Sequence, residues 1–255
     1  MRKKQKAKEE LSPRTLESVK AILESSDSFD CFEKSFRDFS KKWNAIRPRP
    51  SNKEGQNRGT PDDLIQDLYK IWNLRFALDI ASEKGLSIWT EDGSVVPYFC
   101  EPGRLEEMDN HCISEDGTNV GEIFKAWTNK LVLPQVEEKS LAVWCNPPFS
   151  MCDEFFFTAT ELYKRAKLAK ESLTTVLLTP ANIGTVYYYN HVQSFLDRND
   201  PGVFVRVLKP RLKFKGFDQT FPKDCMLTWY TTDPNQINLA NGQNFGVWDR
   251  VKREG

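Results

Sequence analysis

Short apolar runs alternate with helical segments along most of the sequence, and this alternation limits the chain to one fold class. Four runs have the length and composition of buried strands: 141–145, 174–179, 203–208 and 226–231. Residues 151–170 and 185–197 space their apolar side chains three and four positions apart, which predicts helices. Strands that alternate with helices indicate an α/β domain with a largely parallel sheet, because parallel neighbours need crossover connections.

A helix and a further strand are expected upstream. Thr60 is a favourable N-cap and Pro61 a favourable first helical residue, and acidic residues follow at once. The run RFALDIA, residues 75–81, then predicts a short strand that carries the acid Asp79 near its end. Residues 83–140 show a weaker pattern. We expect an irregular acidic region there, largely an insertion, with one or two short strands and a helix near 119–130.

The first part of the chain is expected to be a separate extension. Residues 12–45 have helical spacing, whereas residues 47–59, RPRPSNKEGQNRG, are rich in proline, glycine and charge and almost without apolar residues. We therefore predict an N-terminal helical extension and linker over 1–55, and an α/β domain over 56–255.

The composition excludes several classes of protein. The chain has 255 residues with 36 basic and 36 acidic ones, and no apolar run approaches the ~18 residues of a membrane span. The basic N-terminus is not followed by the apolar segment of a signal peptide. The six cysteines form no CxxC pair, so we expect free thiols in a reducing compartment, the cytoplasm, rather than a disulfide scaffold.

Charge is distributed unevenly along the chain. Residues 79–122 hold 11 acidic residues against two basic ones, whereas residues 204–223 hold six basic residues against Asp218 alone. In the basic stretch Arg211, Lys213 and Lys215 alternate, as side chains do on one face of a strand or extended loop. Two interpretations stay open for them: contacts with phosphates of a nucleic acid, or an ordinary solvated surface.

The buried run 141–145 leads directly into Asn146-Pro147-Pro148-Phe149. Two prolines fix the backbone and cannot extend the sheet, so this loop projects from the carboxyl edge, where open α/β sheets bind ligands. It offers an amide oxygen and a proline carbonyl as fixed acceptors, with an aromatic surface beside them. A planar base with an exocyclic amino group fits this arrangement, because accepting both N–H hydrogens localises the nitrogen lone pair for attack on an electrophile.

These residues resemble a known family. The NPPF motif is similar to the (N/D)PP(Y/F) motif of S-adenosylmethionine-dependent amino-methyltransferases, and its surroundings resemble the phage DNA N-6-adenine-methyltransferase family. The similar segments appear in the family's order over roughly residues 55–231: GTPDDLIQDL (59–68), FALDIAS (76–82), SEDG (114–117) with Trp127, VWCNPPFS (143–150), TVLLTPA (175–181) and VRVLKPRLKFKG (205–216).

The resemblance implies a Rossmann-like methyltransferase fold, mostly parallel with a C-terminal antiparallel strand. It implies S-adenosylmethionine as cofactor, double-stranded DNA as partner, and a bacterial or phage-infected cytoplasm as location. The residues implied to contact the cofactor are Thr60, Pro61, Asp79, Ile80, Ala81 and Asp116. A turn role is the stronger alternative for Asp116. The glycine pair that most methyltransferases place after the first strand is missing here, since Ser82 and Glu83 follow Ala81.

The function expected from the sequence is methyl transfer to N6 of an adenine flipped out of DNA, without a metal ion. Asn146, Pro147, Pro148 and Phe149 would form the adenine site. The same chemistry on RNA adenine or on a protein glutamine is an alternative, and so is a silent nucleic-acid-binding subunit. The tyrosines 187–189 either line the base site or pack in the core.

Overall fold

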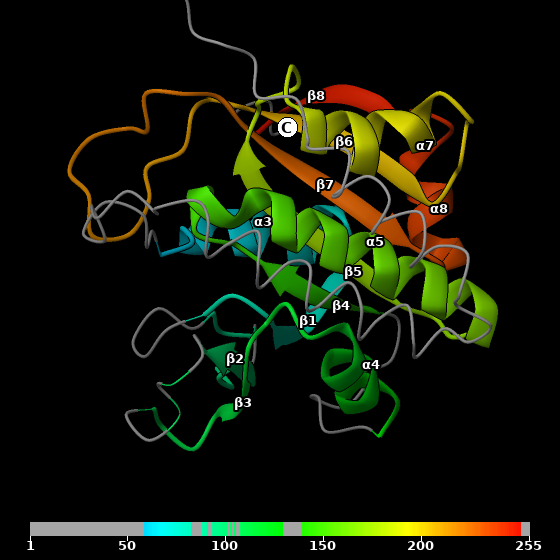
Figure 1. The fold of residues 1–255 in the computed structure, drawn as a ribbon. Helices are drawn as coiled ribbons and strands as arrows, with labels where there is room; N and C mark the ends of the chain where they lie inside the picture. Colours follow the sequence, from blue (N-terminus) through cyan, green and yellow to red (C-terminus); the bar gives the residue numbers. More distant parts are fainter. Residues whose placement is uncertain are drawn as a thin grey trace, which may run out of the picture. The chain divides into compact units, whose positions relative to one another are not determined.

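A computed structural model of the chain describes residues 59–82, 88–90, 93–100, 103, 105, 108–129 and 139–250 (Figure 1). All of them belong to one compact unit, Asn52–Gly255. The predicted N-terminal helical extension, residues 1–55, lies outside the described residues. The structure therefore concerns the α/β domain.

The described residues form one open sheet of eight strands. These are β1 (Leu74–Asp79), β2 (Tyr98–Cys100), β3 (Cys112–Glu115), β4 (Ser140–Cys145), β5 (Thr174–Pro180), β6 (Val203–Lys209), β7 (Cys225–Thr231) and β8 (Phe245–Asp249). Their order across the sheet is β3-β2-β1-β4-β5-β7-β6-β8. Strand β7 is antiparallel to both of its neighbours, and every other neighbouring pair is parallel. The predicted α/β class with a mostly parallel sheet is confirmed.

Helices cover both faces of this sheet, as Figure 1 shows for α5 (Cys152–Ala169) in front and α3 (Asp62–Ile71) behind. One core cluster joins the front of the sheet to α5, to α4 (Val120–Thr128) and to the helical segment 186–196; the other joins the back to α3 and α8 (Pro234–Ala240). Because both faces are covered, residues 141–145 of β4 are all apolar, and their side chains alternate between the two clusters. No helix in the described part of the chain is long and apolar enough to cross a membrane.

Helix ends mostly follow their local sequence. The Asn119 side chain accepts a hydrogen bond from the Glu122 amide at the start of α4, and Asp233 accepts one from the Asn235 amide at the start of α8. Helix α3 differs from the prediction. Pro61 occupies its N-cap position and no side chain caps it. The expectation that Thr60 caps this helix is wrong. Its hydroxyl instead accepts hydrogen bonds from the side chains of Trp144, in β4, and Asn146, just after β4.

The one or two short strands and the helix expected within residues 83–140 are confirmed as β2, β3 and α4. Two further predictions need correction. The acidic stretch after Ser82 is not merely an insertion, because β2 and β3 extend the sheet beyond β1. These strands are only three and four residues long, too short to show a clear alternation. Strand β7 is antiparallel as predicted but is not the last strand: α8 and β8 follow, and β8 pairs in parallel with β6. None of the residues of this edge strand is buried, so it has no continuous apolar run by which the sequence could have predicted it.

Candidate functional site

The order of the strands reverses between β1 and β4. The chain builds β2 and β3 on one side of β1 and then begins again with β4 on the other side. In open α/β sheets, ligands bind beyond the carboxyl ends of the strands at such a reversal. Strand β1 ends at Asp79, and β4 ends at Cys145, directly before the NPPF motif (146–149). The structure therefore brings the predicted cofactor acid and the predicted catalytic motif to one point.

Asp79 is a buried carboxyl group. Its side chain accepts a hydrogen bond from the Ala81 amide at 3.0 Å, and the residue is 3% exposed. No basic side chain among the described residues forms an ion pair with it. Burial raises its pKa from 3.8 to about 7, although the hydrogen bond from Ala81 acts to lower it. A buried carboxyl group without a cationic partner is costly to the fold, and such groups concentrate at functional sites.

The turn after Asp79 is tied to both neighbouring strands. The Ile80 amide donates to the Trp144 carbonyl of β4 at 3.0 Å, and the Ser82 amide donates to the Phe99 carbonyl of β2 at 3.3 Å. These bonds hold Ile80 and Ala81 in place without the glycine pair. The predicted residues Asp79, Ile80 and Ala81 thus form one short turn at the strand reversal.

A glycine on a neighbouring loop allows a very close approach to this turn. Gly117 follows β3, and a Cβ atom built on it would lie 1.6 Å from the carbonyl oxygen of Ile80. Any other residue would collide with that backbone, so glycine is required here. The sequence shows only an Asp-Gly turn, and the reason for its glycine is the close approach of the loop after β3 to the turn after β1.

Asp116 reaches the same edge but its carboxylate serves the turn. Its backbone has a φ of 62°, and its Oδ1 atom accepts hydrogen bonds from the amide (3.1 Å) and the hydroxyl group of Thr118. The Asp116 amide itself donates to the Cys100 carbonyl at 2.9 Å. These contacts favour the turn role for Asp116.

Thr60 connects α3 to the NPPF motif. Its hydroxyl oxygen accepts hydrogen bonds from the Asn146 side-chain amide and from the Trp144 indole, each at 3.2 Å. Because the amide nitrogen of Asn146 is held in this way, its carbonyl oxygen occupies the opposite branch of the side chain, as the predicted acceptor role requires. Thr60 is 3% exposed. The family resemblance implied a cofactor contact for Thr60, whereas the structure places its hydroxyl against Asn146.

The two prolines differ in what their carbonyl groups do. The Pro148 carbonyl accepts a hydrogen bond from the Met151 amide at 2.8 Å, which closes the 3₁₀ turn Phe149–Met151 before α5. No group among the described residues donates to the Pro147 carbonyl. Of the two, the Pro147 carbonyl is therefore the one that can act as the second acceptor beside Asn146.

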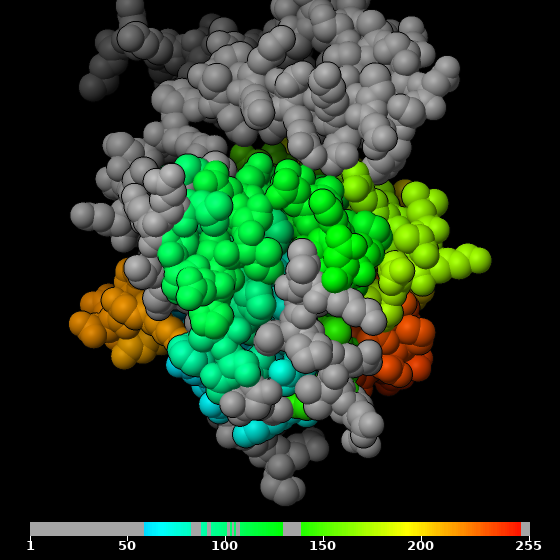
Figure 2. Space-filling model, turned by 90° about the horizontal axis from the view of Figure 1, so that it is seen from below, coloured from blue at the N-terminus to red at the C-terminus, as the bar shows by residue number. Residues whose placement is uncertain are grey.

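Phe149 belongs to an aromatic cluster with the β6–β7 loop (210–224). Its ring centroid lies 6.0 Å from that of Phe214 and 5.2 Å from that of Phe221, and these two rings also contact each other. The Lys215 amide in turn donates to the Gly59 carbonyl at 2.9 Å. Figure 2 shows the loop (orange) standing out from one side of the molecule, next to the start of the described chain. The cluster places this basic loop beside the NPPF motif.

The three predicted nucleic-acid contacts have different surroundings. Within the loop Leu212 and Phe214 are buried, so the alternating basic residues face outward. Arg211 pairs with Asp224 at 2.8 Å, and Lys215 pairs with Asp62 at 2.5 Å. Lys213 is exposed and has no ion pair within the described part of the chain. Lys213 is the member of the three whose charge is open to a phosphate.

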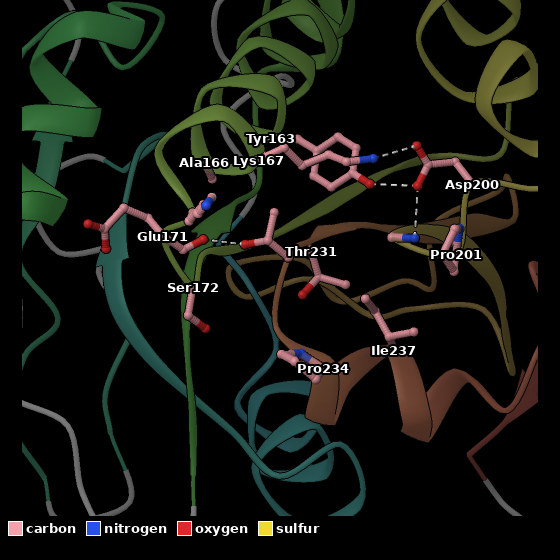
Figure 3. Close-up of a pocket in the computed structure, with 13 residues that line it drawn as sticks. Tyr163, Ala166, Lys167, Glu171, Ser172, Asp200, Pro201, Thr231, Pro234 and Ile237 are labelled. Carbon is pink, nitrogen blue, oxygen red and sulfur yellow. Dashed lines mark hydrogen bonds and ion pairs between the residues drawn. The ribbon is translucent and has the colours of Figure 1, made fainter.

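A second polar cluster lies at the other end of the strands, opposite the carboxyl ends of β1 and β4 (Figure 3). It lines a groove of about 450 Å³ where α5 ends and β5 begins. Asp200 is one of the lining residues, and its carboxylate accepts hydrogen bonds from the Tyr163 hydroxyl (2.6 Å), the Gly202 amide (3.1 Å) and the Lys167 ammonium group (3.2 Å). None of the residues predicted from the sequence to form the site lines this groove.

The chain was also compared with known proteins. No protein-family model, no curated protein and no solved structure matched it.

Proposed function

We propose that this chain transfers a methyl group from S-adenosylmethionine to N6 of adenine in double-stranded DNA. One observation carries the proposal: a buried carboxyl group that has no cationic partner among the described residues and an oriented asparagine amide lie at the carboxyl ends of the neighbouring strands β1 and β4, where the strand order reverses. The mostly parallel sheet with its antiparallel β7 supports the Rossmann-like methyltransferase fold that the sequence resemblance implies.

Asp79 suits a cationic cofactor. S-adenosylmethionine carries positive charge and would supply the electrophilic methyl group. A cation beside Asp79 lowers the pKa of this carboxyl group from about 7, so that binding releases a proton. The carboxyl group must be ionised to attract the cation, and we therefore expect cofactor affinity to increase as the pH rises through about 7.

Asn146 and Pro147 suit an amino group on a flat ring. The amide oxygen of Asn146 and the carbonyl oxygen of Pro147 would accept its two N–H hydrogens, which localises the nitrogen lone pair and stabilises the positive charge that develops during attack. Phe149 offers part of its ring for stacking while Phe214 and Phe221 fix its position. Thr60 acts as a positioning residue for the Asn146 amide.

Nucleic acid is favoured over a protein substrate because the exposed Lys213 lies on the loop that packs on Phe149. An adenine inside a duplex cannot reach a recessed site, so the base would have to be flipped out of its stack. RNA adenine, a protein glutamine and a silent subunit remain the competing functions, and one experiment separates them.

The experiment incubates the full chain with methyl-labelled S-adenosylmethionine and unmethylated duplex DNA, and then digests the DNA to nucleosides. We expect the label in N6-methyl-2′-deoxyadenosine. If RNA or protein, offered in parallel, is labelled and DNA is not, then RNA or protein is the substrate and the proposal of DNA is wrong. Cofactor binding without transfer to any of the three, or no cofactor binding at all, would contradict methyl transfer.

Asn146→Ala tests the mechanism within the same assay. Removing one stabilising group from a transition state typically costs about 100-fold in rate, so we expect a loss of at least about that size. Cofactor binding, measured by equilibrium dialysis, should be retained because the lost contact is made mainly in the transition state. Asn238→Ala is the matched control, since Asn238 is an exposed residue on α8. An Asn146→Ala variant with wild-type rates would contradict the role assigned to the motif.

A further inference from the structure

Three large apolar side chains are exposed directly after β5. Ile183 is 56% exposed, Val186 is 77% exposed and Tyr189 is 60% exposed. Strand β5 pairs with β4 in parallel, so the segment that follows it begins at the same edge as the NPPF motif. Exposed apolar groups gathered within seven residues beside a candidate active site suggest a contact surface.

The segment that carries these side chains is anchored at several points. Just before it, the Ala181 amide donates to the Asp224 carbonyl at 2.9 Å, which ties the end of β5 to the β6–β7 loop. Tyr188 is buried in the core, and the ring of Tyr187 stacks on Phe156 of α5 at 5.4 Å. Of the two earlier interpretations for the three tyrosines, packing thus holds for Tyr187 and Tyr188, whereas Tyr189 faces solvent.

The helix changes its geometry at the last of the exposed residues. Tyr189–Gln193 form a π-helical turn between the short helices α6 (Val186–Tyr188) and α7 (Ser194–Leu196). Such turns are rare and are found frequently at functional sites. The Thr185 hydroxyl accepts a hydrogen bond from the Tyr188 amide, so Val186 stands at the capped start of this helical segment. The anchored backbone presents its apolar side chains in a defined arrangement.

The charges nearby favour duplex DNA as the occupant of this surface. The adjoining β6–β7 loop carries four basic residues, among them the exposed Lys213 and Lys223, and two acidic ones. Asp224 is paired with Arg211, whereas Asp218 is exposed, so the loop is basic overall. Apolar side chains flanked by basic residues are typical of proteins that insert a wedge between base pairs. At a site that takes up a flipped base, the duplex is left with a gap that an apolar group can fill.

We propose that Val186, flanked by Ile183 and Tyr189, forms a wedge that enters the duplex and occupies the space left by the adenine. This inference rests on the proposed function, because it assumes that the base moves into the site at Asn146. By filling the gap, the wedge stabilises the unstacked DNA from which transfer occurs. It therefore affects duplex substrates and leaves single strands, which need no unstacking from a duplex, unaffected.

The test uses Val186→Ser combined with Tyr189→Ser, and compares methyl transfer to unmethylated duplex DNA and to the same DNA separated into single strands. Unstacking a base is costly, so we expect the rate on duplex DNA to fall roughly tenfold or more while the rate on single strands is unchanged. Leu168→Ser is the matched control. Leu168 is 79% exposed and lies near the end of α5, whereas the NPPF motif adjoins the start of this helix. Equal losses on both substrates, or no loss on duplex DNA, would overturn the wedge.

A binding measurement separates failure of the wedge from failure of the proposed function. Wild-type protein should bind a short duplex with one abasic site more tightly than the intact duplex, roughly tenfold, because the gap is already present. The double variant should bind the two duplexes equally, as measured by fluorescence anisotropy. This outcome would support the wedge even if no methyl group were transferred, whereas an unchanged preference in the variant would overturn the wedge even in an active methyltransferase.

Discussion

Two aspartates at opposite edges of the sheet have opposite surroundings. Asp79, at the carboxyl end of β1, has a hydrogen bond from one backbone amide, and burial raises its pKa to about 7. Asp200, at the other edge, is also partly withdrawn from water, which acts to raise its pKa. Hydrogen bonds from Tyr163, from the Gly202 amide and from Lys167 outweigh this effect, and the pKa of Asp200 is lowered.

The ionised carboxylate of Asp200 stabilises the fold, whereas that of Asp79 destabilises it. The hydrogen-bond donors around Asp200 stabilise its negative charge within the protein, so this carboxylate does not need a bound cation. Around Asp79 the charge has no such compensation among the described residues. Natural proteins keep a destabilising group of this kind where a ligand needs it, at the expense of stability. This contrast favours Asp79 over the groove at Asp200 as part of the candidate functional site.

The largest effect on stability is expected for Asp79→Asn. Between pH 3.8 and about 7 the folded protein keeps Asp79 protonated while the unfolded chain is ionised, so the stability of the wild type falls as pH rises through this window. Above pH 7 the full cost remains, on the order of 4 kcal/mol for a shift of this size. The variant should therefore gain about that free energy of unfolding at pH 8 and almost none at pH 4, measured by urea denaturation.

The same variant should lose its affinity for S-adenosylmethionine, because the neutral amide offers no charge to a cation. Titration calorimetry at pH 8 measures this binding. A variant that is more stable but binds the cofactor as before would separate Asp79 from the proposed site. A variant that is less stable at pH 8 would show that Asp79 has a cationic partner after all.

A somewhat smaller effect is expected for Gly117→Ala. The added Cβ atom would overlap the Ile80 carbonyl, and separating these two backbone segments should cost roughly 3 kcal/mol. The turn that holds Asp79 should shift with Ile80, so cofactor binding should weaken as well. Gly184→Ala is the control, since no atom lies within 4 Å of its added Cβ. Equal unfolding free energies for the two variants would contradict the close approach.

The smallest of the three effects is expected for Asp200→Asn, and its sign is opposite to that of Asp79→Asn. The pKa of Asp200 is lowered in the fold, so its charge adds stability above pH 3.8, and this contribution is lost as the pH falls through the folded pKa. Loss of charge-assisted hydrogen bonds should cost about 2 kcal/mol at pH 7. Cofactor binding should be unchanged. A stabilised Asp200→Asn variant would remove the contrast between the two edges.

Much of the fold could be predicted because its strands are buried on both faces. Such strands appear as short apolar runs, and β1, β4, β5, β6 and β7 were located from them within one or two residues. Strands β2 and β3 were expected only as one or two short strands somewhere within residues 83–140, and β8 was not predicted. The first two are very short, and β8 lies at the edge with Phe245 and Val247 exposed, so none of them has a continuous apolar run.

For the candidate site, the sequence by itself placed Asp79 and the NPPF motif at strand ends, because prolines and the ends of apolar runs act locally. Only the tertiary structure joined Asn146 to Thr60, 86 positions away, set Gly117 against Ile80, and packed Phe214 and Phe221 on Phe149. Contacts between such distant residues depend on how the strands are ordered and how the loops pack beside them. A local pattern in the sequence carries no record of that arrangement.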